Sequence, residues 1–245
     1  MLIYGHRGAK GEAPENTLSG FAFLRNQGIH RVELDIQLDK NGEPIVIHDD
    51  SVNRTTNARG AISKYDASQL AQLDARGPWK KEFLEVDGVP SLSAVLDAWP
   101  MLASIQIEVK KMPLNQGAIA ARRIVEICKH FQLHERAIIT SQHLPFLQHL
   151  RDTHCEQAMG MVASKLTKGL VQHAVKLGCS YLCLKWKVCN PDIVEEAHAA
   201  GLHVSLWTMN DPAHLEKFHA WGVDSIITDY PSKFTPVFSP DKQGQ

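Results

Sequence analysis

From residue 100 onward, short apolar runs alternate with longer stretches in which apolar residues recur every three or four positions. The apolar runs lie at residues 105–109, 137–140, 158–162, 181–184, 203–207 and 225–228. The periodic stretches lie at 115–131, 143–153, 167–178, 190–200 and 211–221. The first pattern is typical of buried strands and the second of amphipathic helices. Prolines at two helix starts, and Gly178, Gly201 and Gly222 at three helix ends, fit these boundaries.

The first half of the chain adds a strand at 2–5, a helix at 17–27 and strand material at 31–48. Closing about eight such βα units predicts an α/β fold, a TIM-like (β/α)8 barrel, whose sites lie at the C-terminal ends of the strands. An open, doubly wound sheet is the alternative. No GxGxxG motif opens a helix, which disfavours a dinucleotide-binding version of that sheet.

Residues 50–90 interrupt this alternation with a polar, turn-rich segment that contains one short helical stretch at 67–73. We interpret the segment as a small insertion over the active face, placed after the hairpin of the second strand. The predicted organisation is therefore a single catalytic barrel domain at 1–238, followed by a polar tail at 239–245.

The composition and net charge limit which kinds of partner the protein is expected to bind. The chain has 245 residues, 44% of them hydrophobic, and a net charge of −1. This balance leaves no basic field for nucleic acid or an acidic membrane. No apolar run approaches the roughly 20 residues that span a bilayer, and the apolar start is too short for a signal peptide. We expect no nucleic-acid partner, no stable membrane insertion and a cytoplasmic location; monomer and weak dimer both remain open.

Cysteine usage agrees with that location. The chain has five cysteines, an odd number, and they lack the CxxC pairs of a zinc site. Free, mostly buried thiols in a reducing compartment are the interpretation that fits best.

The stretch at 31–48 alternates with period two, which places Glu33 and Asp35 on one face of the predicted strand. Asn41-Gly42 follows, the strongest short signal for a two-residue type I′ hairpin turn. Such a turn pairs Asp35 with His48 in a non-hydrogen-bonded pair, with Cα atoms about 4.5 Å apart. Two carboxylates and an imidazole then converge, unless this is simply the solvated face of a hairpin.

A second polar face lies on the predicted strand at 105–109. Glu108 and Lys110 alternate there with apolar residues, whereas a central parallel strand should be apolar on both faces. Buried charges are costly unless they are paired or bind a metal, so they indicate a site; a solvated edge strand is the alternative. The strand at 2–5 delivers His6 and Arg7, between two glycines, to the same end of the barrel.

These side chains can meet at one barrel mouth. The set comprises three carboxylates (Glu33, Asp35, Glu108), two histidines (His6, His48) and two cations (Arg7, Lys110). Three hard oxygen donors suit Mg²⁺ or Ca²⁺ better than Zn²⁺. Fixed cations beside a hard metal suit a phosphate, and histidines suit acid and base roles near neutral pH.

Eight segments occur in an order that covers nearly the whole chain: "GHRG" (5–8), "APENT" (13–17), "VELDIQLDKNGEPIVIHDD" (32–50), "NRTTN" (53–57), "VPSL" (89–92), "IQIEVK" (105–110), "WTMN" (207–210) and "ITDYP" (227–231). Each alone is weak, but the ordered set is highly specific. With these segments the chain resembles the glycerophosphodiester phosphodiesterase family, and its compact cytoplasmic bacterial members most closely.

The resemblance implies a barrel enzyme that hydrolyses a small-molecule glycerophosphodiester to sn-glycerol 3-phosphate and an alcohol, in glycerol and lipid metabolism. It implies one divalent cation, Mg²⁺ or Ca²⁺ with Mn²⁺ as a further candidate, held by Glu33, Asp35 and Glu108. His6 and His48 match the family's general acid and base, without deciding which is which, and Arg7 and Lys110 match its phosphate-binding residues. The nucleophile is water or the glycerol 2-hydroxyl. Lys10 and Glu12 stand in a loop where the family usually has small residues, and this difference concerns substrate preference and not the chemistry.

Further residues each have two interpretations. Trp207 lines the glycerol pocket as a substrate-binding residue, or it packs at the top of the barrel. Asn16 caps the helix at 17–27, or it orients His6 or Arg7. Arg54 holds the 50–90 segment down, or it meets substrate. Asn210 is predicted to be a cap or turn residue and Asp229 a structural one.

Two other functions remain open at this point. Phospholipase-D-like or lyase activity on a lipid phosphodiester should bring an exposed apolar or basic docking loop. A non-catalytic binder of phosphate esters should lack at least one residue of the site, and all of them are present.

Overall fold

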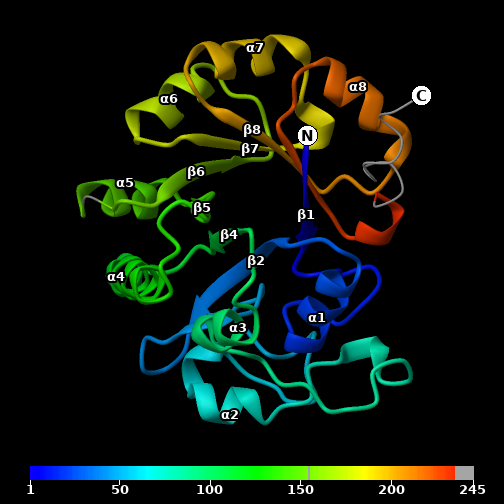
Figure 1. Ribbon diagram of the computed structural model, residues 1–245. Helices are drawn as coiled ribbons and strands as arrows, with labels where there is room; N and C mark the ends of the chain where they lie inside the picture. The colour runs from blue at the N-terminus through cyan, green and yellow to red at the C-terminus, as the bar shows by residue number, and fades with distance from the viewer. Residues whose placement is uncertain (154, 235–245) are drawn as a thin grey trace.

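Parallel strands close into a barrel in the computed structural model, which describes residues 1–153 and 155–234 (Figure 1). Within those residues the barrel has eight parallel strands: β1 (Leu2–His6), β2 (Arg31–Leu38), β4 (Ser104–Val109), β5 (Ala137–Ser141), β6 (Ala158–Ala163), β7 (Tyr181–Lys185), β8 (His203–Trp207) and β9 (Ser225–Thr228). The strands lie side by side in chain order, and β1 pairs with both β9 and β2. The predicted barrel is confirmed, and the open sheet is excluded by this closure.

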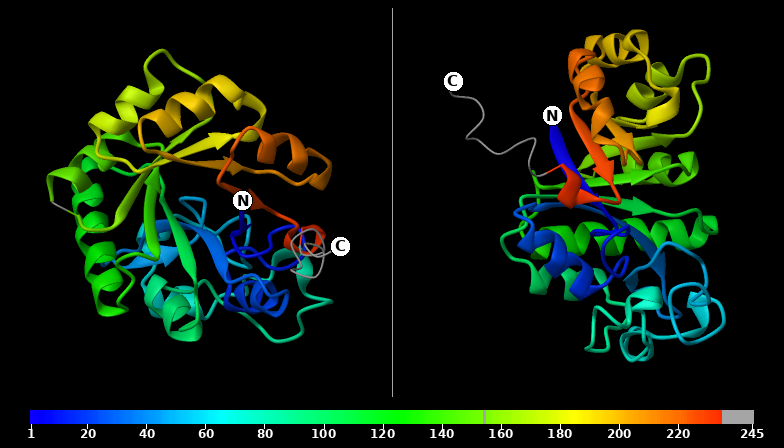
Figure 2. Two further views of the ribbon diagram at one scale, coloured as in Figure 1. Left: turned by 45° about the horizontal axis from the view of Figure 1, so that its top comes forward. Right: turned by 90° about the vertical axis from the view of Figure 1, so that its right-hand side faces the viewer.

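Helices cover the outside of the barrel (Figures 1 and 2). They are α1 (Leu18–Asn26), α3 (Leu92–Ala98), α4 (Leu114–His130), α5 (Leu144–Asp152), α6 (Leu170–Lys176), α7 (Pro191–Ala199) and α8 (Leu215–Ala220). The short helix α2 (Ala67–Ala71) lies instead within residues 50–90. Short 3₁₀ turns lie at Ile62–Lys64, Gly77–Trp79, Trp186–Val188, Pro212–His214 and Pro231–Lys233. The predicted stop signals are confirmed, because Gly178, Gly201 and Gly222 adopt φ values of 77°, 76° and 85° after α6, α7 and α8.

The helix α3 was not predicted. Ser91 caps it, because the Ser91 hydroxyl accepts a hydrogen bond from the backbone N–H of Ala94. Leu92, Val95 and Leu96 form its buried face. Its seven residues present too short a periodic stretch to stand out beside the turn-rich segment that precedes it.

The hairpin register differs from the prediction by one residue. β3 (Pro44–Val46) runs antiparallel to β2, with Leu38 opposite Pro44. Ile47, and not His48, follows opposite Asp35, and its N–H donates to the Asp35 carbonyl at 3.0 Å. The predicted two-residue type I′ turn is therefore wrong.

A three-residue loop at 40–42 replaces that turn, and the Asp39 side chain explains why. Asp39 Oδ1 accepts hydrogen bonds from the N–H groups of Asn41 and Glu43 at 2.7 and 2.8 Å. Gly42 then takes a left-handed φ of 80°, as expected of a three-residue loop that ends in a bulge. The local side-chain bonds outcompete the tighter turn that Asn-Gly would otherwise favour.

Residues 50–90 lie beside α1 and α3 at one flank of the barrel (Figures 1 and 2). They contribute to a second hydrophobic cluster that includes Ile45 and Ile47 of the hairpin, together with Val52, Ile62, Leu70, Ala75 and Val89. Asp87 of this segment accepts a hydrogen bond from the N–H of Ser19 at 2.6 Å, which ties the segment to α1. The predicted tail at 239–245, and residues 235–238 of the predicted domain, lie outside the described residues.

The main core lies between the strands and the covering helices. On β2 the apolar residues Val32, Leu34, Ile36 and Leu38 all belong to it, which leaves Glu33 and Asp35 facing the barrel interior. All five cysteines are unpaired, and four of them are buried. No helix among residues 1–153 and 155–234 has both the length and the apolar character needed to cross a lipid bilayer.

Replacing Gly5 with alanine is expected to destabilise the fold by about 1–3 kcal/mol through overpacking. A Cβ at Gly5 would stand 2.0 Å from the Gly8 carbonyl oxygen and 2.6 Å from the side chain of Leu24. Urea unfolding measures the change. Gly117→Ala is the control, because its nearest foreign atom is 3.8 Å away and alanine favours the interior of α4. Equal stability of Gly5→Ala and the parent would show that the turn after β1 adapts freely.

Candidate active site

His6 is the last residue of β1, and Arg7 lies in the turn that follows it. Arg7 adopts a left-handed φ of 51°, which is uncommon for a residue with a side chain. The turn is held by hydrogen bonds on both sides of Arg7: the N–H of Asn16 donates to the Arg7 carbonyl at 2.9 Å, and the Arg7 N–H donates to Glu33 Oε2 at 3.2 Å. Strained backbone of this kind concentrates at functional sites.

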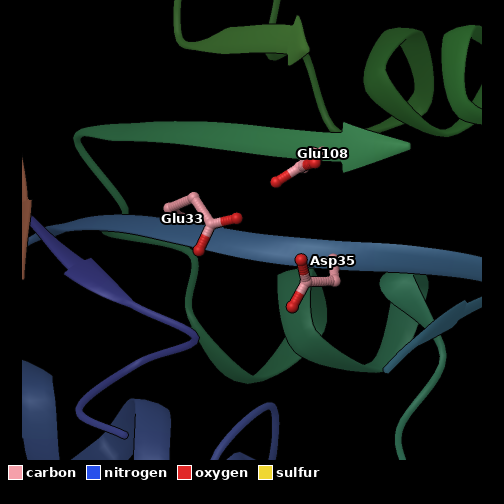
Figure 3. A group of neighbouring side chains, drawn as sticks. All are labelled: Glu33, Asp35 and Glu108. Atoms are coloured by element: carbon pink, nitrogen blue, oxygen red, sulfur yellow. The ribbon is translucent and has the colours of Figure 1, made fainter. Parts of the chain in front are cut away.

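Three carboxylates from two neighbouring strands lie close together (Figure 3). Glu33 and Asp35 come from β2 and Glu108 from β4, and Asp35 lies beside Glu108 in the strand register. One oxygen of each lies within 4.8 Å of the others. The side chains of Glu33 and Asp35 are buried.

Two cations partly neutralise this cluster. Lys110 Nζ lies 2.7 Å from Asp35 Oδ1 and 2.9 Å from Glu108 Oε2. Arg7 Nε lies 3.0 Å from Asp35 Oδ2. Burial opposes ionisation of Asp35, but Lys110 and Arg7 outweigh it and hold the pKa of Asp35 below its usual range.

Glu33 remains the uncompensated member of the cluster. Burial, followed by the charges of Asp35 and Glu108, raises the pKa of Glu33 well above its usual range. Its Oε1 is buried and has no hydrogen-bond partner among the described residues. Three oxygen donors with one unsatisfied atom and excess negative charge fit a hard divalent cation.

Each of the two histidines has an aspartate on its Nδ1 atom. His6 Nδ1 lies 2.5 Å from Asp229 Oδ1, and His48 Nδ1 lies 2.7 Å from Asp49 Oδ1. His6 Nε2 faces the acidic cluster, 3.8 Å from Glu33 Oε2. A carboxylate on Nδ1 fixes the ring and leaves Nε2 available for proton transfer.

The surroundings of His48 favour its neutral form. Burial lowers the pKa of His48, and the positive charges of Lys110 and Arg7 add to that effect. Together they outweigh Asp35 and Asp49, which act in the opposite direction. A histidine that is neutral near pH 7 is suited to accept a proton.

Asp229 and Asn210 were not predicted to serve the site. Asn210 Nδ2 donates to Asp229 Oδ2 at 2.8 Å, and the Asp229 N–H donates to Asn210 Oδ1 at the same distance. The pair thus holds Asp229 against His6. The predicted closure of the barrel could have indicated this contact, because it makes the last strand pair with the first. β9 pairs with β1, and Gly5 lies opposite Thr228, so the next residues, His6 and Asp229, lie side by side.

The ambiguous residues resolve as follows. Thr17, and not Asn16, caps α1, because the Thr17 side chain accepts from the N–H of Gly20. Asn16 instead donates to Asp35 Oδ2 at 3.0 Å. Arg54 donates to Glu15 and Asp49, at the edge of the mouth.

A pocket opens beside the carboxylates. It is lined by His6, Glu33, Gln106, Glu108, Thr140, Val162, Cys183, Trp207 and Ile227. Trp207 Nε1 donates to the Cys183 carbonyl at 3.1 Å, which holds the indole in the pocket wall. All eight side chains predicted from the sequence are therefore at or beside one site.

Comparison with known proteins decides the family. The model of the glycerophosphoryl diester phosphodiesterase family matches residues 6–233. The chain belongs to this family.

Several relatives match over nearly their full length. YhdW of Bacillus subtilis is 31% identical, covering 94% of this chain and 95% of its own. A glycerophosphodiester phosphodiesterase of Bacillus altitudinis is 30% identical, covering 96% and 97%. An Oleispira antarctica phosphodiesterase, solved with the product sn-glycerol-3-phosphate, is 28% identical with a TM-score of 0.88, and 96% of each chain is covered. The barrel is thus a fold that this chain shares with a solved phosphodiesterase.

Proposed function

We propose that this protein hydrolyses glycerophosphodiesters to sn-glycerol 3-phosphate and an alcohol with the help of one divalent cation. The phosphodiesterase class follows from membership of the family. The finer proposal is supported by Glu33, whose buried Oε1 has no hydrogen-bond partner within residues 1–153 and 155–234. Glu33 belongs to the cluster of three carboxylates, and its Oε2 lies 3.8 Å from His6 Nε2. The product bound to the Oleispira antarctica relative is the one the proposal expects.

Glu33, Asp35 and Glu108 would hold the cation, with Mg²⁺ or Ca²⁺ as the first candidates and Mn²⁺ as another. When bound, the cation supplies positive charge to the phosphate oxygens. Arg7 and Lys110 bind the same phosphate as fixed cations, and both already lie against Asp35. Trp207 forms one wall for the glycerol moiety.

His6 and His48 transfer the protons. One removes a proton from the attacking hydroxyl, and the other protonates the leaving alkoxide oxygen. Asp229 and Asp49 stabilise each imidazolium and keep the proton of the neutral ring on Nδ1. The two histidines therefore need no rearrangement between the steps.

The same proposal treats residues 1–238 as one catalytic unit in the cytoplasm. Five unpaired cysteines support that location.

The first experiment is to incubate metal-stripped protein with glycerophosphocholine, with and without Mg²⁺, Ca²⁺ or Mn²⁺. We expect release of sn-glycerol 3-phosphate only with added metal. If folded protein releases none with any metal, other glycerophosphodiesters are the next substrates. If the protein hydrolyses none of these substrates either, the remaining functions are hydrolysis of a lipid phosphodiester and non-catalytic binding of a phosphate ester.

Replacing Asp229 with asparagine is expected to lower kcat about 10²-fold, the lower end of what acid–base catalysis contributes. Asn210 Nδ2 requires an acceptor at Asp229 Oδ2, so the new amide would turn its NH₂ group toward His6. That NH₂ would donate to Nδ1 and force the ring proton onto Nε2. Steady-state kinetics should show this loss in kcat with a small change in KM.

Asp224→Asn is the matched control for this substitution. Asp224 also pairs with a histidine, His198, at 2.9 Å, but it lies just before β9, at the opposite end of the barrel. An equal loss of kcat in both variants would contradict the role of Asp229.

A further inference from the structure

One guanidinium from the 50–90 segment bridges two carboxylates at the edge of the mouth. Arg54 Nη1 and Nη2 donate to Glu15 Oε2 and Oε1 at 2.7 and 2.9 Å. Arg54 Nε and Nη2 donate to Asp49 Oδ2 and Oδ1 at 2.8 and 3.1 Å. Paired bonds of this kind use the planar fork of arginine, so they fix direction as well as charge.

Each of these carboxylates has a second partner in the candidate site. Arg7 Nη1 donates to Glu15 Oε1 at 2.8 Å. His48 Nδ1 lies 2.7 Å from Asp49 Oδ1. These are the same two oxygens that Arg54 Nη2 reaches, so a continuous path of hydrogen bonds joins the Arg7 guanidinium to the His48 imidazole through Arg54.

Anchoring of the 50–90 segment does not explain this arrangement. The second hydrophobic cluster and the Asp87–Ser19 hydrogen bond already attach the segment to the barrel. The four hydrogen bonds of the Arg54 guanidinium end on the two carboxylates that also contact Arg7 and His48.

The electrostatics agree with the geometry. Hydrogen bonds from Arg54 are the largest cause that lowers the pKa of Asp49, to about 2. Burial opposes ionisation of Glu15, but hydrogen bonds from Arg54 and Arg7 outweigh it and lower the pKa of Glu15. Both carboxylates are therefore ionised at neutral pH, as they must be to orient a cation and an imidazole.

We propose that Arg54 is a positioning residue, through which the 50–90 segment sets the orientation of both Arg7 and His48. It acts through Glu15 on the phosphate-binding guanidinium and through Asp49 on the histidine. This inference rests on the proposed function, because Arg7 and His48 have their roles there.

The test compares Arg54→Gln with Arg54→Lys and with Arg76→Gln. We expect Arg54→Gln to lower kcat about tenfold to a hundredfold, the usual effect of losing a residue that orients a functional group. Its affinity for sn-glycerol 3-phosphate should fall about tenfold, as for the loss of a charged hydrogen bond. Arg54→Lys keeps the charge without the fork, so it should recover only part of either loss.

Arg76→Gln is the matched control within the same segment. Arg76 also pairs with an aspartate through two nitrogens, Asp74 at 2.9 Å each, but its other bonds go to the carbonyls of Phe83 and Leu84. It should lower the melting temperature and leave kcat and product affinity unchanged.

A second background separates positioning from general damage. Introduced into His48→Ala, Arg54→Gln should cause a clearly smaller further loss of kcat than in the parent, because the path through Asp49 then ends on no imidazole. It should still weaken the binding of sn-glycerol 3-phosphate through Arg7. If Arg54→Gln lowers kcat by the same factor in both backgrounds, or if Arg76→Gln has the same effect, the proposal is overturned. Should the parent hydrolyse no glycerophosphodiester, the proposed function fails, whereas product binding still tests the Arg7 branch.

Discussion

Replacing Glu33 with glutamine is expected to lower metal-dependent hydrolysis strongly while leaving the metal-free protein at least as stable as the parent. Glu33 is buried beside two other carboxylates, and its Oε1 has no hydrogen-bond partner among the described residues. Such a group destabilises a fold unless a cation joins it. A neutral amide of the same size removes the repulsion and a candidate metal ligand together.

The expected loss of activity is about 10³-fold, because a metal ion supplies several kcal/mol of charge stabilisation and each 1.4 kcal/mol is about tenfold in rate. Thermal unfolding tests binding separately. A cation at a hundred times its Kd stabilises the folded parent by about 2.7 kcal/mol. For a chain of this size, that corresponds to a rise in Tm of roughly 5–10 °C. Glu33→Gln should lose most of this rise while keeping or exceeding the metal-free Tm.

Glu12→Gln is the control for Glu33→Gln. Glu12 lies in the loop after β1, where its Oε2 accepts a hydrogen bond from the N–H of Ser232 at 3.2 Å, outside the carboxylate cluster. It should keep both the activity and the metal-induced rise. A full rise in Glu33→Gln would show that the cation binds elsewhere.

The two-residue periodicity of β-strands made most of this site predictable from sequence. Residues two apart on a strand share a face, so the spacing alone groups Glu33 with Asp35, and Glu108 with Lys110. The barrel then brings the C-terminal ends of all strands together. The prediction that Glu33, Asp35, Glu108 and Lys110 share one site depends only on strand periodicity and on the barrel fold.

The hairpin shows where local rules fail. The Asn41-Gly42 signal is real, but the Asp39 side chain competes for the same backbone N–H groups. The resulting one-residue shift removes the predicted Asp35–His48 pair. His48 is still close enough to Asp35 to feel its charge, because the strand β3 ends at Val46 and the chain bends at residues 48–50.

Partners that belong to distant segments were beyond sequence reasoning. Asp229 reaches His6 across 223 positions, and Arg54 reaches Glu15 across 39. Neither contact follows from periodicity or from a turn. They depend on barrel closure and on how the 50–90 segment packs, which are properties of the whole fold.

Removing either histidine is expected to lower kcat about 10²–10⁴-fold, the contribution of one acid or base group. The two variants should differ in how they respond to the leaving alcohol. Burial, with the positive charges of Lys110 and Arg7 in addition, lowers the pKa of His48 and favours the neutral ring, so we expect His48 to be the base. His6 then protonates the leaving oxygen.

A series of glycerophosphodiesters with alcohols of rising pKa distinguishes these roles. The defect of His6→Ala should grow as the alcohol becomes a poorer leaving group, because an unprotonated alkoxide then departs with more difficulty. The defect of His48→Ala should stay nearly constant along the series. His143→Ala, at the start of α5 on the same end of the barrel, should behave as the parent. If instead the defect of His48→Ala grows along the series and that of His6→Ala stays constant, His48 is the acid and His6 the base.

The pH profile tests the same assignment independently. A general base must be neutral, so kcat/KM of the parent should fall as the pH drops through the pKa of His48. That pKa lies below the usual value because burial and the neighbouring cations disfavour the charged ring. This acidic limb should disappear in His48→Ala and persist in His6→Ala. A limb that persists in His48→Ala would assign the base to another group, because alanine at that position has no proton to exchange.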